Sequence, residues 1–525
     1  MPQHRHALAV ALALTLLPFA AQAREAGDDD AYASIATLKQ AYARGELTPT
    51  GMTQLFLDRI ARIDKAGPKV NAVLETNPDA LAIAGKARGG KGPLAGIPIL
   101  LKDNIDTGDR MQTTAGSLAL AGSTAPKDST VAAKLRKAGA VILGKANLSE
   151  WANIRSNHAT SGWTGRAGLT LNPYVLDRNA CGSSAGSGSA VAAGLATVAI
   201  GSETDGSIIC PASMTGLVGI KPTVGLVSRT GIIPISHSQD TAGPMARSVA
   251  DAAAVLSAIA GSDPSDVATK DADKHATDYT KFLDPNALRG KRIGVARQLA
   301  GIEPNADAAL EKTIALLKAQ GATVIDNVEI PHLKELSENE LDVMLYEFKH
   351  DIAAYLATRP NQPMKTLADL IAFNDAHKEQ EMPWFGQELF LMAEQKGGLD
   401  DPKYKTIVEK NKRLAGPEGI DAALAKDHLD ALLAPSWGPA FVNDLVLGDH
   451  VVSGDPTVGG VSAPAAIAGY PSITLPVDFA HELPVGVVFF GAKWSEPTLI
   501  GIAYGVEQKA NTFRRPKFLP TLPVN

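Results

Sequence analysis

The chain has 525 residues, with 50 lysines and arginines against 56 aspartates and glutamates and a net charge of −6. This charge balance gives no cationic surface that would bind nucleic acid or an anionic membrane. The two cysteines are too few for a disulfide scaffold or a four-cysteine zinc site. Because 45% of the residues are hydrophobic, the chain can bury a large core. Its length allows about three domains at roughly 100–200 residues each.

Residues 1–23 have the pattern of a signal peptide. A weakly basic start around Arg5 is followed by an apolar run from Ala7 to Ala21, and Ala21 and Ala23 are small residues at positions −3 and −1 of a cleavage site. The run is shorter than the ~20 residues of a membrane span. We therefore expect removal of residues 1–23 and export of the protein, to the periplasm or the medium, without membrane insertion. A buried N-terminal helix is the alternative.

Three segments predict alternating helices and strands. Gly96–Leu101 is a buried strand that ends at Lys102. Asp128–Leu143 and Ala306–Ile325 each have an amphipathic helix, a glycine that ends it, and a short apolar strand. Alternation of this kind predicts an α/β fold, a central mixed sheet with helices on both faces.

The stretch from about 335 to 427 is more charged and mostly helical in pattern. Leu341, Leu345, Phe348 and Ile352 fall on one helical face. We interpret this stretch as a helical insertion packed on the sheet. No repeat and no long linker divides the chain, which favours one large domain.

A serine- and glycine-rich segment, Cys181–Ser189, precedes the apolar run Val191–Ile200. A flexible linker is disfavoured because linkers are not usually set against apolar runs. A phosphate-binding loop is also disfavoured, because the segment lacks the Gly-x-x-x-x-Gly-Lys-Ser/Thr motif of such loops. A serine nucleophile is the third possibility, and Ser184 occupies the centre of a Gly-x-Ser-x-Gly pattern. An esterase with Ser184 as nucleophile would also need a catalytic histidine. Neither His237 nor His450 lies in a sequence that suggests a catalytic role, which disfavours an esterase.

Several ordered motifs resemble the amidase signature family over residues 32–520. Within that family the sequence is most similar to bacterial peptide amidases. The motifs are Gly96–Asn104, Asn147–Asn153, Gly182–Ser187, Glu203–Ile208, Gly231–Ser236, Ala463–Ala465, Gly469–Thr474, Leu483–Gly486 and Arg515-Pro516.

The resemblance implies a Ser-Ser-Lys triad that hydrolyses carboxamides through an acyl-enzyme. Ser207 would be the nucleophile, and Ser183, after a cis peptide bond, would bridge it to the base Lys102. Backbone N–H groups of the turn Thr204, Asp205, Gly206 and Ser207 would form the oxyanion hole. No metal or organic cofactor is implied.

Lys102 must lose its proton to act as a base. A free lysine has a pKa of about 10.4, and burial lowers it. The apolar residues Ile99–Leu101 predict such burial. The charge of Asp103 would oppose this lowering of the Lys102 pKa unless the Asp103 side chain faces the other way.

Two positions depart from the family pattern. Ile209 stands where most members have an arginine that holds an acidic substrate group, and Asp205 replaces a glycine beside the nucleophile. We therefore expect a neutral substrate, a peptide or similar molecule with a C-terminal carboxamide. Asp205 would accept a hydrogen bond from its NH or NH2, or would only order the turn.

Cys181 and Cys210 flank the expected catalytic loops. We favour buried, small apolar side chains over a catalytic thiol and leave a disulfide open. Two other functions compete with a peptide amidase: a general aliphatic or aryl amidase of the same family, and an exported solute-binding protein without catalysis. The sequence gives no oligomeric state.

Overall fold

The computed structural model describes residues 23–337, 339–449 and 461–523. Within these ranges an eleven-stranded sheet has the order β1-β3-β2-β4-β6-β5-β10-β11-β9-β7-β8. Its strands are β1 (Val73–Thr76), β2 (Pro98–Lys102), β3 (Val141–Ala146), β4 (Val198–Glu203), β5 (Val218–Lys221), β6 (Thr241–Ala246), β7 (Arg292–Val295), β8 (Thr323–Ile325), β9 (Ala431–Pro435), β10 (Ser472–Ala480) and β11 (Leu483–Phe490).

The sheet is mixed, as predicted. β2 runs parallel to β3 and β4, and β7 runs parallel to β8 and β9. The other pairs are antiparallel. All five residues of β2 are buried, because this strand lies inside the sheet with a neighbour on each side.

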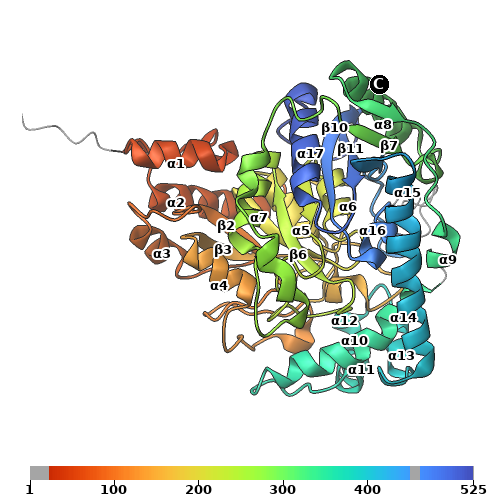
Figure 1. The fold of residues 1–525 in the computed structure, drawn as a ribbon. Helices are drawn as coiled ribbons and strands as arrows, with labels where there is room; N and C mark the ends of the chain where they lie inside the picture. The colour runs from red at the N-terminus through yellow and green to blue at the C-terminus, as the bar shows by residue number, and fades with distance from the viewer. Residues whose placement is uncertain (1–22, 338, 450–460, 524–525) are drawn as a thin grey trace, which may run out of the picture.

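Helices surround the sheet (Figure 1). α4, α7, α17 and α8 contact one another in succession and form one layer, whereas α5 and α6 contact each other and form a second. The helices are α1 (Ile35–Ala43), α2 (Pro49–Arg59), α3 (Ala80–Lys86), α4 (Thr130–Lys137), α5 (Ala185–Ala192), α6 (Ile209–Met214), α7 (Val249–Ile259), α8 (Pro304–Ala319), α9 (Leu333–Ser337), α10 (Glu340–Ala357), α11 (Leu367–Ala376), α12 (Lys378–Glu381), α13 (Glu388–Glu394), α14 (Pro402–Ala415), α15 (Asp421–Lys426), α16 (Ala463–Ala468) and α17 (Glu496–Ala510).

Local chemistry explains the elements that were predicted. At α4, Ser129 caps the first turn by accepting from the Ala132 N–H, and Gly139 follows the helix with φ of 88° before β3 begins. α8 and β8 repeat this order within the predicted segment.

The serine- and glycine-rich segment forms α5, and every residue of this helix is buried. Small side chains allow that close packing: a Cβ on Gly186 would lie 2.3 Å from the carbonyl oxygen of Ala72. A flexible linker is therefore excluded. The helix begins directly after Ser184, so the buried packing of α5 fixes the position of the serine pair.

The segment 335–427 is mostly helical and contains α9 to α15. Leu345, Phe348 and Ile352 of α10 join an apolar cluster that includes Trp151, whereas Leu341 is 37% exposed. The expected apolar face is thus wrong at Leu341. The apolar cluster against α10 begins one turn further along the helix, at Leu345. In Figure 1, α10 to α13 of this segment lie at the bottom of the molecule, and α14 and α15 extend up its right side.

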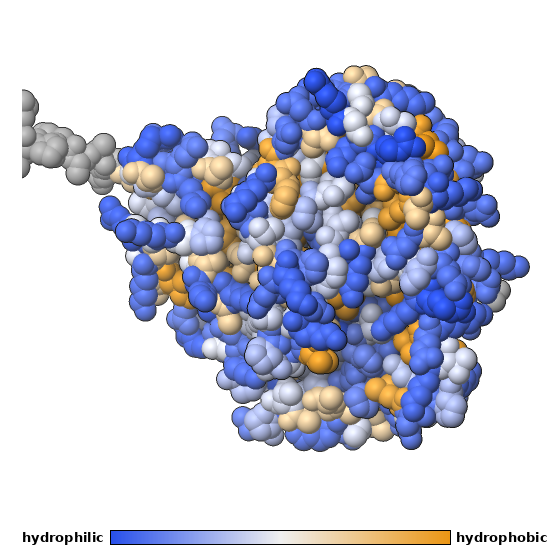
Figure 2. All heavy atoms as spheres, in the orientation of Figure 1, coloured by the Kyte–Doolittle hydropathy of each residue, from blue (hydrophilic) through white to orange (hydrophobic). Residues whose placement is uncertain are grey.

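The face of the molecule in Figure 2 is mostly hydrophilic, with apolar residues in small separate patches. Within the described ranges, no helix is long and apolar enough to cross a membrane. The predicted signal peptide, except for Ala23, lies outside the described residues.

Candidate active site

Lys102 is the last residue of β2, and its side chain is completely buried. Its Nζ donates to Ser183 Oγ (2.7 Å), to Ser202 Oγ (2.9 Å) and to the carbonyl oxygen of Ser202 (3.1 Å). Burial lowers the pKa of Lys102 to about 7, although the charges of Asp240 and Glu203 act in the opposite direction. Lys102 is thus close to half deprotonated at neutral pH.

Asp103 faces away from Lys102, as the sequence interpretation required. Its Oδ2 accepts from the backbone N–H groups of Thr114 (3.1 Å) and Gly116 (3.2 Å), and it lies 3.7 Å from Arg166. Its carboxyl group therefore belongs to a separate polar cluster and does not hold Lys102 in its charged form.

Ser183 lies between Lys102 and the first turn of α5. The Gly182–Ser183 peptide bond is cis, as the family resemblance implied. Gly182 is the residue that fits before it, since a Cβ there would lie 2.2 Å from Ser149 Oγ. The backbone N–H of Ser149 donates to the Ser183 carbonyl (2.9 Å) and fixes this loop from the other side.

Ser207 lies in the turn between β4 and α6 and is 8% exposed. Gly206 has φ of 77°, and a Cβ there would lie 2.8 Å from the Trp437 ring. Glu203 Oε2 accepts from the N–H groups of Ile208 (2.7 Å) and Ile209 (3.0 Å) and thereby shapes the turn. Among the described residues, no hydrogen-bond acceptor is found for the backbone N–H groups of residues 204–207.

The structure brings the predicted residues together in part. Lys102 contacts Ser183 directly, and the Ser184 N–H donates to the Ser207 carbonyl (3.1 Å), so the two serine loops are adjacent. No hydrogen bond joins the Ser183 and Ser207 hydroxyl groups within the described part of the chain. The catalytic roles of Lys102, Ser183 and Ser207 therefore stay predictions.

Ser184 does not form the nucleophile elbow of an esterase. Its Oγ donates to the carbonyl oxygen of Ser202 (3.1 Å) and accepts from the Ser202 N–H (3.2 Å), and the side chain is completely buried. His237 instead bonds Asp351 through Nδ1 (2.8 Å), and His450 lies outside the described residues. Ser184 thus links the serine loop to β4.

Asp205 is partly buried beside Ser207. Burial raises its pKa to about 6, and the charge of Glu203 adds to the rise. Glu340, in the first turn of α10, lies near it: burial and the charge of Asp205 raise the pKa of Glu340 well above its usual range. Glu340 accepts from Gln239 Nε2 (2.8 Å), which also reaches the Thr204 carbonyl (3.4 Å).

A cavity of about 380 Å³ adjoins the site. Its wall includes Asn104, which follows β2, Ser202 of β4, Thr204 of the turn after β4, and Asp240, whose carboxylate accepts from Thr204 Oγ1 (2.6 Å). Because Ser202 also accepts from Lys102, the cavity reaches the hydrogen-bonding shell of the buried lysine. Across the described residues, no group of three or more His, Cys, Asp or Glu side chains could hold a metal ion.

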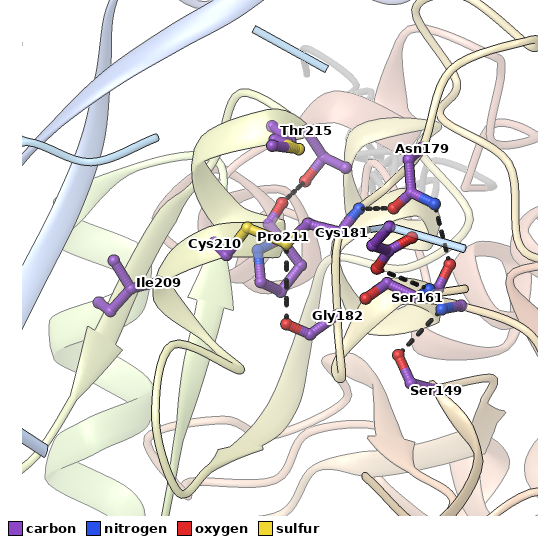
Figure 3. The surroundings of a disulfide bond; sticks show 12 residues. Ser149, Ser161, Asn179, Cys181, Gly182, Ile209, Cys210, Pro211 and Thr215 are labelled. Atoms are coloured by element: carbon purple, nitrogen blue, oxygen red, sulfur yellow. Dashed lines mark hydrogen bonds between the residues drawn. A yellow bond between two sulfur atoms is a disulfide. The ribbon is translucent and has the colours of Figure 1, made fainter. Parts of the chain in front are cut away.

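Cys181 and Cys210 form a disulfide (Figure 3). The structure thus selects the pairing that the sequence left open over two free thiols. Their Cα atoms lie 5.9 Å apart although 29 residues separate them in sequence. Only the fold brings them together, which is why spacing alone left the pairing open.

Comparisons with known proteins agree with this geometry. A family model described as Amidase matches residues 52–500. The chain belongs to the amidase family. It is thus a hydrolase that acts on amides.

Three relatives of this amidase are informative. Native peptide amidase from Stenotrophomonas maltophilia is 50% identical, with a TM-score of 0.87 over 93% of this chain and 99% of that one. Peptide amidase PAM in complex with the competitive inhibitor chymostatin is also 50% identical, with a TM-score of 0.88 over the same shares. A probable amidase of Arabidopsis thaliana is 40% identical over 504 residues, 93% of this chain and 92% of the relative.

Sequence reasoning missed several residues that lie close to the candidate site. Ser202 and Glu203 stand beside the Thr204–Ser207 turn, so their position next to a motif was a usable signal. Asp240 and Glu340 carry no such signal, because only the fold brings them near this turn.

Proposed function

We propose that this amidase hydrolyses the C-terminal carboxamide of peptides, with Ser207 as nucleophile, Ser183 as proton bridge and Lys102 as base. The observation that carries this proposal is the 2.7 Å hydrogen bond between Lys102 Nζ and Ser183 Oγ in a fully buried environment. A lysine with a pKa of about 7 supplies a base at neutral pH that an exposed lysine does not.

Once Lys102 is neutral, its amine can still donate two of its three hydrogen bonds. The Ser202 carbonyl can only accept, so one N–H of Lys102 is directed to it, and a second is directed to Ser202 Oγ. The lone pair of the neutral amine then faces the Ser183 hydroxyl. Lys102 takes the proton of Ser183 as Ser183 takes that of Ser207, whose Oγ bonds to the amide carbon.

The same groups complete the reaction. As the carbon–nitrogen bond breaks, Lys102 returns a proton through Ser183 to the leaving nitrogen, and ammonia departs. A water molecule then attacks the acyl-enzyme, gives its proton to the same relay and releases the peptide acid. The unpaired N–H groups of the turn Thr204–Ser207 stabilise the oxyanion in both steps, each by about 3–4 kcal/mol.

The surroundings of Ser207 support a neutral substrate. Ile209 is buried in an apolar cluster with Val488 and supplies no cation for a substrate carboxylate. The Asp205 carboxylate accepts a hydrogen bond from a peptide N–H or the amide NH2, and at neutral pH it repels acids. The 50% identity to peptide amidases supports the peptide as the remainder of the substrate.

An ammonia-release assay tests the proposal. We expect the wild-type protein to release ammonia from peptide amides faster than from simple aliphatic amides. Ser207→Ala and Lys102→Ala should lose activity, whereas Ser184→Ala should fold and keep part of it. Wild-type rates in Ser207→Ala would refute the triad, and a preference for aliphatic or aryl amides would refute the peptide specificity.

We also propose that the protein is exported after cleavage behind Ala23. The signal-peptide pattern of residues 1–23 supports this, and so does the disulfide between Cys181 and Cys210, because disulfides form and persist in oxidising compartments.

A further inference from the structure

The disulfide joins the two loops that carry the proposed catalytic serines. Cys181 lies two residues before Ser183, and Cys210 lies three residues after Ser207. Figure 3 shows the bridge between the loop that contains Gly182 and the start of α6. It therefore ties together the two segments that carry Ser183 and Ser207.

Each sulfur is attached to a fixed part of the fold. The Cys181 N–H donates to Asn179 Oδ1 (2.6 Å), and Asn179 Nδ2 donates to the Ser161 carbonyl (3.1 Å) and to Asn443 Oδ1 (2.9 Å). Cys210 is 1% exposed in α6, and its N–H donates to the Gly206 carbonyl (2.8 Å). Movement of one sulfur therefore moves the backbone next to a proposed catalytic serine.

Hydrogen bonds of Ser184 also join the serine loop to β4 and to the turn that follows it. Ser184 Oγ bonds the carbonyl and the N–H of Ser202 in β4. The Ser184 N–H donates to the Ser207 carbonyl (3.1 Å), on the far side of Ser183 from Cys181. The disulfide and this hydrogen bond thus bracket Ser183, one link on each side. Without the disulfide, the hydrogen bonds of Ser184 remain, and all of them lie on the far side of Ser183 from Cys181.

We propose that the Cys181–Cys210 disulfide is a positioning element for the acyl-transfer step, so that full amidase activity requires the oxidised protein. The proposal rests on the proposed roles of Ser183 and Ser207. It gives the enzyme a redox dependence: activity is low while both cysteines are thiols and rises once the bond forms in an oxidising compartment. Cys181 is partly exposed, which opens the bond to a reductant.

The redox step balances as a two-electron exchange. Another disulfide takes two electrons and two protons from the two thiols and becomes a dithiol when the bond forms. A phosphine reverses this step in the laboratory: water supplies oxygen to the phosphine and one hydrogen to each sulfur. Neither half-reaction needs a group from the active site.

The test measures kcat and KM for ammonia release from a peptide amide with the full-length oxidised protein, before and after treatment with a phosphine. We expect kcat to fall about 10- to 100-fold with KM changed less than about twofold, because a shift of about 1 Å in a reacting group costs rate and not binding. The variant Cys181→Ala/Cys210→Ala should have the kcat of the reduced wild type, and treatment with the phosphine should not change it. Reoxidation should restore the wild type alone.

Two readouts separate this proposal from its alternatives. Far-UV circular dichroism and Tm report whether the reduced protein is folded. If reduction unfolds the protein, or if kcat is unchanged on reduction, the positioning role is wrong. Hydrogen exchange needs no turnover: the amides of 181–184 and 204–210 should exchange faster on reduction while the rest of the sheet does not. Unchanged exchange overturns the proposal even if the oxidised protein hydrolyses no peptide amide, a result that by itself contradicts only the proposed function.

Discussion

Lys102 is completely buried. The described residues include two other buried lysines: Lys145 donates to the Ile105 carbonyl and to Thr113 Oγ1, and Lys221 donates to the Tyr470 carbonyl. Lys102 instead donates to two serine hydroxyls, groups that can pass a proton onward. Its environment is suited to proton transfer because one of these hydroxyls belongs to Ser183, whose loop lies next to that of Ser207.

The first prediction concerns this base. Because only neutral Lys102 can accept a proton, and its pKa is about 7, kcat/KM of the wild type should rise with pH through about 7 and level off above it. Lys102→Arg keeps the charge but has no basic form near neutrality, so kcat should fall about 100- to 10,000-fold.

Steady-state kinetics between pH 5 and pH 9 measure both effects. Lys137→Arg is the matched control, because Lys137 is exposed at the end of α4 and the change leaves the site intact. A wild-type profile without an inflection near pH 7, or an active Lys102→Arg enzyme, would contradict the role of Lys102.

The second prediction concerns Asp205 as a substrate-binding group. The pKa of Asp205 is about 6, so its carboxylate is ionised above that pH, and KM for peptide amides should fall as the pH rises through 6. Asp205→Asn keeps the shape but loses the charge, and should raise KM about 10-fold, the value of one hydrogen bond to a charged group. Asp400→Asn, at an exposed site, is the control. If KM stays at the wild-type value, Asp205 only orders the turn.

At the scale of elements, α5 joins packing to catalysis. Its eight residues are all buried, and its start fixes the serine pair, so the glycines and serines serve as small residues that let the helix lie against the backbone of neighbouring segments. Glu203 has a comparable role at α6, where its carboxylate accepts two N–H groups of the first turn.

The third prediction tests this close packing. A Cβ on Gly186 would meet the Ala72 carbonyl oxygen at 2.3 Å and backbone atoms of Asn147 at 2.5 Å, none of which can rotate away. Gly186→Ala should therefore lower the free energy of unfolding by about 1–3 kcal/mol. In the control Gly85→Ala, on the exposed side of α3, the nearest atom is 4.0 Å away, and stability should stay equal or rise by up to about 1 kcal/mol. Chemical denaturation measures the free energy of unfolding of both variants. If Gly186→Ala were as stable as the wild type, α5 would have space for the added methyl group.

Sequence reasoning succeeded where a feature depends on neighbours along the chain. The apolar run before Lys102 predicted a buried strand and a buried amine, and the capped helix with its glycine predicted α4 and β3. It was weaker where contacts come from distant segments. Leu341 fitted the helical period but lies beyond its cluster, the two cysteines gave no sign of pairing, and Glu340 had no local pattern.

At the scale of the whole molecule, the sheet places three separate parts of the chain at one site. Lys102 comes from the end of β2, and Ser207 follows the end of the neighbouring parallel strand β4, so the sheet order itself brings the proposed base and the proposed nucleophile to one edge. The segment 335–427 adds Glu340 from α10. Because these parts belong to one continuous sheet and its helices, a single large domain builds the site.

The last prediction concerns export of this whole molecule. Arg24, the residue after the expected cleavage site, is tied to the fold: its backbone N–H donates to the Glu46 carbonyl (3.1 Å), and its side chain pairs with Asp30 (2.6 Å). A new α-ammonium group at Arg24 can keep that hydrogen bond, so cleavage behind Ala23 should leave the fold unchanged. N-terminal sequencing of the protein from the exported fraction should begin at Arg24. Ala23→Arg should block cleavage because position −1 needs a small residue, whereas Gln22→Asn, at the tolerant position −2, should be processed normally. Full-length protein that starts at Met1 and stays in the cytoplasm would contradict export.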